Sequence, residues 1–207
     1  MIDRGLVALL ANSNPARNAS IQARKQAFAL RLWNSSKSIT GTAAEKYLIG
    51  RNLASLCSSR ALRYCDDTPH PEGGRHPAMI AIVQDIAGAP VAVHRTYLQP
   101  NGRKAIVEPV KASLGPVWGG AIRLNEHRPD KPLVIAEGIE TAAAAGCLMG
   151  YPAWAAISAG NLGRGMLLPT EVRRVCIAAD PDDAGRHAAR DAWQRWRAAL
   201  RDAEDGG

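Results

Sequence analysis

The stretch Val175–Arg186 reads VCIAADPDDAGR and joins an apolar run to a cluster of carboxylates. The apolar run predicts a buried strand, and the residues from Ala184-Gly185 onward are typical of a helix. Asp180, Asp182 and Asp183 would then follow the carboxyl end of that strand, the edge at which open α/β sheets bind ligands. The Asp-Pro-Asp-Asp sequence also suits a turn and a helix N-cap, so the stretch alone leaves both interpretations open.

Carboxylates placed this close together repel one another. At about 4 Å and an effective dielectric constant near 20, the repulsion between two of them is roughly 4 kcal/mol. A cluster that stays ionised therefore requires a cation, and clustered carboxylate oxygens suit Mg²⁺ or Mn²⁺.

A second acidic position follows another predicted strand, because the apolar run Leu133–Ala136 ends at Glu137-Gly138. Parallel strands share their carboxyl edge, so Glu137 would lie beside Asp180 and Asp182. The region alternates strands with helices, which predicts a parallel sheet. The expected strands are 133–136, 153–157 and 172–179, and the expected helices are 139–149 and 184–200.

The chain before this unit has a different pattern. Ser20–Trp33 is a basic amphipathic helix, and the capping box Thr42-Ala-Ala-Glu45 predicts a second helix that continues to Leu53. An Asn101-Gly102 turn and a short connection at 86–89 predict an antiparallel meander. Its expected strands are 79–85, 90–97 and 104–108.

These patterns divide the chain into three parts, with a boundary at the proline-flanked segment 129–132. We expect a helical N-terminal arm over residues 1–40, an α+β subdomain over residues 41–130 and an α/β domain over residues 131–203.

Composition and charge narrow the class of protein. The chain has 207 residues, 46% of them hydrophobic, and a formal net charge of +7. A basic protein with a local acidic cluster fits a polyanionic partner bound through metal ions, although an arginine-rich surface gives the same charge. No apolar run approaches the length of a membrane span and Leu6–Leu10 is too short for a signal peptide, so we expect a cytoplasmic protein with no membrane partner. The four cysteines lack Cys-x-x-Cys spacing and indicate buried free thiols.

The pairing of Glu-Gly after one apolar strand with Asp-x-Asp and Ala-Gly after another resembles the Toprim domain of topoisomerases, bacterial primases and certain nucleases. The segment 157–161 (ISAGN) is similar to the glycine-containing loop between the acidic motifs of that family. Three upstream features are similar to the N-terminal subdomain of the bacterial primase polymerase core. They are Tyr47-Leu-x-x-Arg51, the meander with Gly88 and Arg95, and Lys111–Pro116.

The likeness covers roughly residues 42–200 and extends to Toprim primase-like proteins of phages, plasmids and integrated elements, in which Glu-Gly-Ile-Glu-Thr is a familiar form. It implies an α/β fold in which a Toprim domain, a Rossmann-like parallel sheet flanked by helices, follows a smaller α+β subdomain with an antiparallel meander.

The resemblance also implies the roles of individual residues. Glu137, Asp180 and Asp182 would be catalytic and would bind Mg²⁺ or Mn²⁺, with Glu137 as general acid/base or metal ligand. Arg95 and Lys111 would face the acidic cleft as cations that bind single-stranded DNA or a nucleotide, and the nearby Arg186 would contact phosphate. For Glu140, one helical turn after Glu137, two roles remain open: it supports the metal through water, or it interacts with the helix dipole.

Two departures from the cellular primases favour an incomplete metal site. Those enzymes carry an Asp where this chain has Thr141, and they place a further acidic motif on a strand beyond the final helix, where this chain has the polar residues 201–207. Three functions therefore remain open. The first is a primase-like nucleotidyltransferase in mobile-element DNA replication, with a helicase acting in trans as a further partner. The others are a Toprim nuclease and a non-catalytic nucleic-acid-binding accessory protein.

Overall fold

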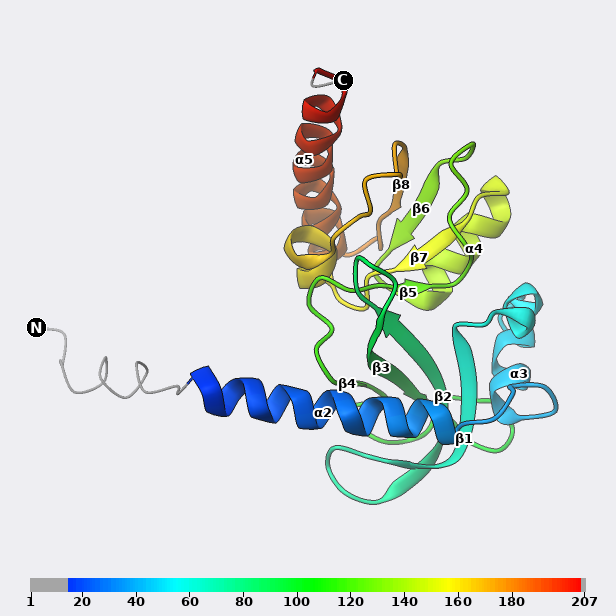
Figure 1. Cartoon of the computed structure of the whole chain (residues 1–207). Coiled ribbons are helices and arrows are strands. Elements are labelled where there is room, and N and C mark those ends of the chain that lie inside the picture. The colour runs from blue at the N-terminus through cyan, green and yellow to red at the C-terminus, as the bar shows by residue number, and fades with distance from the viewer. Residues whose placement is uncertain (1–14, 206–207) are drawn as a thin grey trace, which may run out of the picture.

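The computed structural model describes residues 15–205, which form two four-stranded sheets with helices on their outer faces (Figure 1). The first sheet is antiparallel throughout, in the order β1-β2-β3-β4. Its strands are β1 (Leu62–Pro69), β2 (Arg75–Gln84), β3 (Pro90–Tyr97) and β4 (Lys111–Leu114). The predicted antiparallel meander is confirmed, but only two of its three expected strands form, and β1 and β4 were not expected.

The second sheet has the order β5-β7-β6-β8. Its central strand β6 pairs in parallel with both β7 and β8, whereas the edge strand β5 is antiparallel to β7. The strands are β5 (Ile122–Arg123), β6 (Leu133–Ala136), β7 (Ala153–Ala155) and β8 (Val175–Ala178). The predicted α/β class, in which parallel strands follow an antiparallel unit, is confirmed. The domain boundaries at residues 40 and 130 stay predictions.

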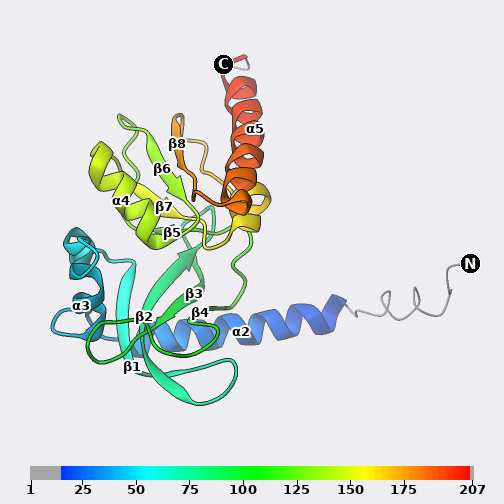
Figure 2. The same ribbon diagram turned by 180° about the vertical axis from the view of Figure 1, so that it is seen from behind.

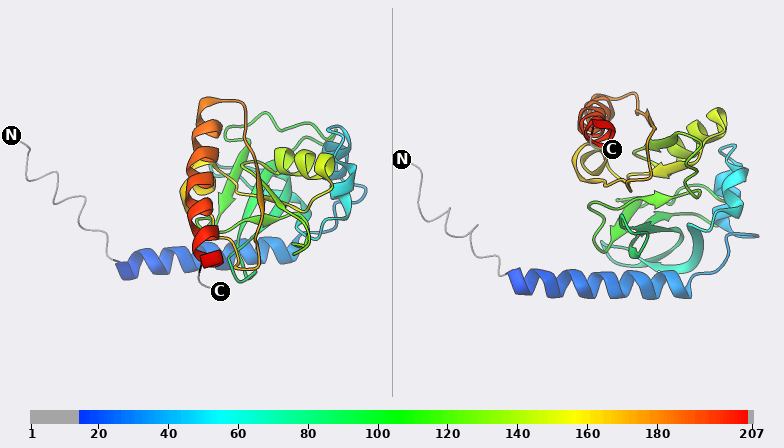
Figure 3. Two further views of the ribbon diagram at one scale, coloured as in Figure 1. Left: turned by 90° about the horizontal axis from the view of Figure 1, so that it is seen from above. Right: turned by 45° about the horizontal axis from the view of Figure 1, so that its top comes forward.

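Two helices lie against each sheet. Helix α2 (Pro15–Ser35) runs along the face of the first sheet that is turned away from the second, and its N-terminal turns project beyond that sheet (Figures 1 and 3). Helix α3 (Ala43–Ile49) packs on β2, followed by the short η1 (Ala54–Ser58). Residues 1–14 of the predicted N-terminal arm lie outside the described residues.

Helices α4 (Ile139–Met149) and α5 (Asp183–Asp205) cover opposite faces of the second sheet, which is visible from above and from behind (Figures 2 and 3). The alternation of side chains along β6 explains this arrangement. Val134 and Ala136 join the core that contains α4, whereas Leu133 and Ile135 join the core that contains Ala192 of α5. A strand buried on both faces reads as a continuous apolar run, which is how β6 appears in the sequence.

The start of α3 follows the prediction, and its end does not. Thr42 Oγ1 accepts a hydrogen bond from the backbone N–H of Ala44 at 3.2 Å, which caps the helix. The helix ends at Ile49 and not at Leu53, because Gly50 terminates it and the chain turns back there, with the N–H of Leu53 donating to the carbonyl of Leu48.

The predicted strand at 104–108 is wrong. The turn at Asn101-Gly102 forms, but Gly102 lies so close to α3 that an added Cβ would be 2.6 Å from Cβ of Lys46. The loop is therefore held on α3, and Lys104 makes only an isolated bridge to Leu98. The edge of β3 pairs instead with residues 111–114.

Two smaller expectations can also be compared with the structure. The cysteines are free, as predicted, but they are not buried: Cys57, Cys65 and Cys176 are partly exposed, and Cys147 is exposed. Within residues 15–205, no helix combines the length and the apolar character that crossing a membrane requires.

Candidate functional site

The structure brings Glu137, Asp180 and Asp182 to one edge of the second sheet. Glu137 follows β6 and the two aspartates follow β8, and these strands are paired in parallel up to Ala136 and Ala178. Burial raises the pKa of Glu137, and the charges of Asp180 and then Asp182 raise it further. Both aspartates are therefore near enough to Glu137 to repel its carboxylate, as the sequence predicted.

The loop after β7 holds Glu137 in place. The backbone of Ala159 hydrogen-bonds the Glu137 carboxylate, and the N–H of Ile157 donates to the Glu137 carbonyl at 2.8 Å. Ile157 has φ of 80°, a left-handed conformation that is unfavourable for a β-branched residue. Such strain persists only where surrounding contacts enforce it, and here it accompanies the positioning of an acidic side chain.

Asn161 connects the same loop to the segment between the two sheets. Its side chain is buried, and its amide nitrogen donates to the carbonyls of Gly120 (2.9 Å) and Ala156 (2.8 Å). Its oxygen accepts from the N–H of Gly119 at 2.9 Å. Asn161 opens the single π-helical turn η2 (Asn161–Gly165), which packs on α5. These contacts tie the glycine-containing loop to the segment that joins the two sheets, a role that the sequence did not reveal.

The two aspartates are held differently. Thr141 Oγ1 donates to Oδ1 of Asp180 at 2.9 Å, so the threonine at this departure from the cellular primases orients an acid without adding one. Asp182 Oδ1 accepts from the N–H of Gly185 at 2.7 Å and so caps the start of α5. Both interpretations of the Asp-Pro-Asp-Asp stretch therefore describe the structure: it caps a helix and it supplies the acidic edge.

Position 185 requires glycine because a side chain there would collide with Asp180. A Cβ at this position would lie 2.8 Å from the Asp180 carbonyl oxygen and 2.9 Å from its Cβ. In Gly185→Ala the gain in helix propensity, about 1 kcal/mol, is opposed by an overpacking cost of about 1–3 kcal/mol. We expect Asp180 to shift, with at least a roughly tenfold loss of Mn²⁺ affinity in calorimetry and only a small change in thermal midpoint.

Gly160→Ala is the matched control for this prediction, because a Cβ at Gly160 meets nothing within 4 Å. Equal Mn²⁺ affinities for the two variants would contradict the role assigned to Gly185.

Glu140 binds a residue of the first sheet. Its carboxylate pairs with the ammonium group of Lys111 at 2.9 Å and accepts a hydrogen bond from the Tyr47 hydroxyl. Burial by itself raises the pKa of Glu140, but Lys111 and Tyr47 together outweigh it and hold this pKa at about 2. These contacts connect α4 to β4 and α3. They account for the position of Glu140 better than the two roles that the sequence left open.

A basic cluster of Lys111, Lys104 and Arg51 lies around this ion pair. The guanidinium of Arg51 is 3.9 Å from the centroid of the Tyr47 ring. Burial lowers the pKa of Lys104, and the nearby charges of Lys111 and Arg51 also lower it, whereas Glu140 raises it. The charge of Lys111 in turn opposes the rise in the pKa of Glu137 that burial and the two aspartates cause. The cluster therefore brings cations from β4, from the loop before it and from the turn after α3 toward the acidic edge of the second sheet.

Arg95 does not share this position, and the expectation that it faces the acidic cleft with Lys111 is wrong. Arg95 lies opposite Ala112 in the β3–β4 register, next to the pair Thr96–Lys111. Successive side chains of a strand point to opposite faces, so Arg95 and Lys111 lie on opposite sides of the sheet. Arg95 is 5% exposed and donates to three carbonyls, those of Pro69 (2.8 Å), Ser113 (3.2 Å) and Ala112 (3.3 Å). Its role in nucleotide binding stays a prediction that these contacts do not support.

We expect Arg95→Met to act on stability. The variant removes three hydrogen bonds, but the Pro69 carbonyl still accepts from the Tyr97 hydroxyl. At about 1 kcal/mol for each carbonyl that loses its Arg95 donor and keeps no other side-chain donor, we expect a loss of about 2 kcal/mol in the free energy of unfolding. Urea unfolding measures this loss, and fluorescence anisotropy with a labelled oligonucleotide should find unchanged affinity in the folded variant. The exposed Arg173, changed to Met, is the control. Full stability combined with lost oligonucleotide affinity would contradict this prediction.

Arg186 lies on the acidic loop but is occupied there. Its guanidinium donates to the Pro181 carbonyl and pairs with Asp183 at 2.5 Å, while about half of the side chain stays exposed. Contact with phosphate stays a prediction for this residue.

The donor chemistry of the acidic edge fits a divalent cation. Carboxylates gathered at one edge are the ligands that hard cations prefer. Within residues 15–205, however, no three His, Cys, Asp or Glu side chains already surround a common metal position. One oxygen each of Asp180 and Asp182 is engaged by Thr141 and Gly185, so their other oxygens are the candidate ligands.

Two family models match separate parts of the chain. Residues 132–204 match the family described as "Toprim domain", and residues 23–124 match a "Domain of unknown function (DUF7146)". The DnaG primase catalytic domain bound to ssDNA superimposes at 15% identity with a TM-score of 0.53, over 84% of this chain and 68% of that one. Residues 132–204 therefore match the Toprim family, and the fold of the chain is similar to that of a primase catalytic domain. Toprim domains generally bind divalent metal ions.

Two further primase structures are similar to this chain. The primase fragment of the bacteriophage T7 primase-helicase aligns at 16% identity and a TM-score of 0.44, over 68% of this chain and 56% of that fragment. The RNA polymerase domain of Mycobacterium tuberculosis primase DnaG aligns at 16% identity and a TM-score of 0.46, over 87% and 72%. The chain thus spans little more than half of the T7 fragment. No curated protein sequence matches it.

Proposed function

We propose that this protein is a DNA-dependent nucleotidyltransferase that synthesises short primers on single-stranded DNA. The observation that carries the proposal is the 2.9 Å ion pair between Lys111 of β4 and Glu140 of α4, which holds a cation of the first sheet one helical turn from Glu137. A nucleoside triphosphate is an anion that needs cations for its phosphates and carboxylates for its metal ions, and both are available here.

Each residue has a role in this proposal. Glu137, Asp180 and Asp182 would hold Mg²⁺ or Mn²⁺, which when bound neutralises charge on a phosphoryl group during transfer. Lys111 would contact the triphosphate, and Glu140 would position the Lys111 ammonium through their 2.9 Å ion pair. Thr141 would orient Asp180 through its hydrogen bond. A 3′-hydroxyl would attack the α-phosphorus and pyrophosphate would leave, the exchange common to nucleotidyl transfer.

Primer synthesis on single-stranded DNA with labelled nucleotides and Mn²⁺ tests the proposal, with a nuclease assay run in parallel on the same DNA. We expect labelled products that depend on the template and are absent without the divalent ion. Cleavage without synthesis would replace the proposal with a Toprim nuclease. DNA binding with neither reaction would favour the accessory protein. The mobile-element context and a helicase acting in trans stay predictions.

A further inference from the structure

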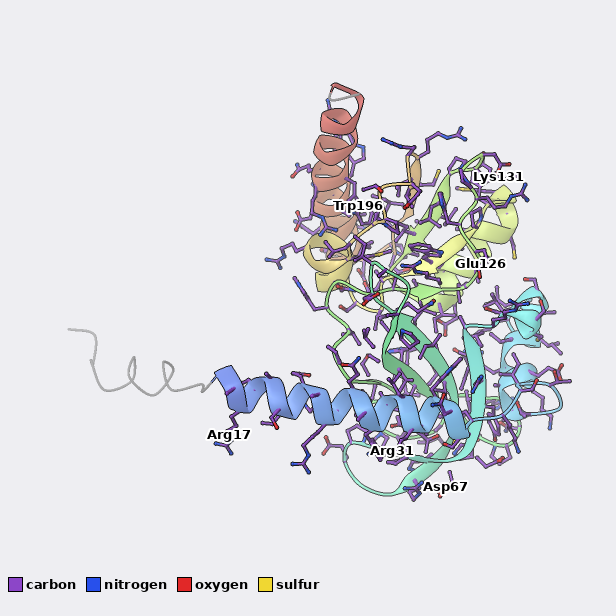
Figure 4. The ribbon with its side chains drawn as sticks, in the orientation of Figure 1. Arg17, Arg31, Asp67, Glu126, Lys131 and Trp196 are labelled. Carbon is purple, nitrogen blue, oxygen red and sulfur yellow. The ribbon has the colours of Figure 1, made fainter. Side chains whose placement is uncertain are left out.

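Helix α2 carries a basic surface on the opposite side of the first sheet from the acidic edge. Its 21 residues include Arg17, Arg24, Lys25 and Arg31 and contain no acidic residue. All four cations are exposed, and no carboxylate of residues 16–197, the part of the chain with described side chains, forms an ion pair with any of them. Arg17 lies on the end that projects beyond the sheet (Figure 4). Four unpaired cations on one helix favour a polyanionic partner.

Apolar side chains lie among these cations. Ala29 and Leu32 are buried against the first sheet, but Ile21 is 39% exposed and Phe28 is 41% exposed. The guanidinium of Arg31 lies 5.6 Å from the centroid of the Phe28 ring. A hollow between α2 and the end of β4 is lined by Ile21, Arg24, Lys25, Phe28, Arg31 and Leu114. An exposed ring flanked by cations is the arrangement that stacks a base and neutralises its phosphates.

We propose that this α2 surface binds single-stranded nucleic acid, with Arg24, Lys25 and Arg31 on phosphates and Phe28 stacked on a base. An anionic membrane surface fits less well. An interfacial helix needs a continuous apolar face, and the apolar face of α2 is mostly covered by the sheet, with Ile21 and Phe28 left exposed.

The position of β4 connects this surface to the acidic edge. Leu114 lines the hollow at one end of the strand, and Lys111 lies at the other end on the opposite face. Three residues of extended chain span about 10 Å, so a nucleic acid strand that passes around the edge strand β4 reaches Lys111 within a few nucleotides. The path of the nucleic acid strand from α2 to Lys111 rests on the proposed function. The binding of nucleic acid at α2 does not.

The test compares two triple variants of equal charge change: Arg24, Lys25 and Arg31 to Gln on α2, and the exposed Arg128, Arg173 and Arg190 to Gln elsewhere. Fluorescence anisotropy measures oligo(dT) affinity over a range of salt concentrations. We expect the α2 variant to lose at least about tenfold in affinity at low salt. Its slope of log K against log salt should be shallower by about 2, since each phosphate contact contributes about 0.7.

Phe28→Ala separates stacking from charge. It should weaken binding at least about fivefold with an unchanged salt slope, since one stacked base contributes on the order of 1–3 kcal/mol. Equal losses in the two triple variants would overturn the proposal, because net charge alone would explain them. Undiminished oligo(dT) binding by the α2 variant, with lost binding to phosphatidylserine vesicles, would overturn it in favour of a membrane surface. The Asp180→Asn variant distinguishes the two proposals. Oligo(dT) binding that still depends on α2 supports the α2 proposal, whether or not this variant has lost primer synthesis.

Discussion

Glu137→Gln and Asp180→Asn are each expected to reduce primer synthesis by at least about a hundredfold while the protein stays folded. Both substitutions keep the size of the side chain and remove a negative charge from the edge that would hold Mg²⁺ or Mn²⁺. Removing one group that stabilises charge in a transition state typically lowers the rate by 10²–10³. The measurement is the yield of labelled primer per unit time on single-stranded DNA, with folding checked by circular dichroism.

Asp183→Asn is the matched control for this prediction. Asp183 lies in the same acidic stretch, but its side chain is 88% exposed and pairs with Arg186. We expect this variant to keep nearly all of its activity. Primer synthesis that survives both Glu137→Gln and Asp180→Asn would remove these residues from the reaction.

The second large effect concerns the stability contributed by Glu140. Its pKa is depressed to about 2 from an ordinary value of 4.5, so the native state favours its ionised form. The resulting stabilisation is fully present above pH 4.5 and is lost as the pH falls through 2. The shift corresponds to roughly 3 kcal/mol in the free energy of unfolding at neutral pH.

We therefore expect Glu140→Gln to be less stable than the parent protein by roughly 3 kcal/mol at pH 7, with the difference closing near pH 2. Urea unfolding at pH 7, 5 and 3 measures this change. The double variant Glu140→Gln with Lys111→Met should lose little more than either single variant, because both break the same ion pair. The exposed Glu72, changed to Gln, is the control. A stability difference that is constant with pH would contradict the role assigned to the ion pair.

The second sheet could be predicted from the sequence because its signals are local. The run Leu133–Ala136 is apolar throughout, since both faces of β6 are covered, and Gly150 ends α4 in a left-handed conformation that suits glycine. The acidic edge followed from the same logic, because parallel strands bring their carboxyl ends together.

The first sheet was harder to predict, because the register of an antiparallel sheet depends on which strands are paired. Arg95 and Lys111 are both cations near predicted strands, and only the observed register places them on opposite faces. The strand β1 contains Asp66 and Asp67, which pair with Lys37 and Arg75 at the surface and obscure the apolar alternation. The contacts of Glu140 with Lys111 and Tyr47 join residues 29 and 93 positions apart, and no local pattern indicates them.

The central claim is that a divalent cation binds at the carboxyl edge of β6 and β8. Anomalous diffraction from a crystal grown with Mn²⁺ and a nucleoside triphosphate tests it most directly. The account predicts a Mn²⁺ peak within coordination distance of Glu137, Asp180 and Asp182, with Lys111 on the phosphates. A nucleotide bound with its Mn²⁺ elsewhere, and an acidic edge without a peak, would contradict it.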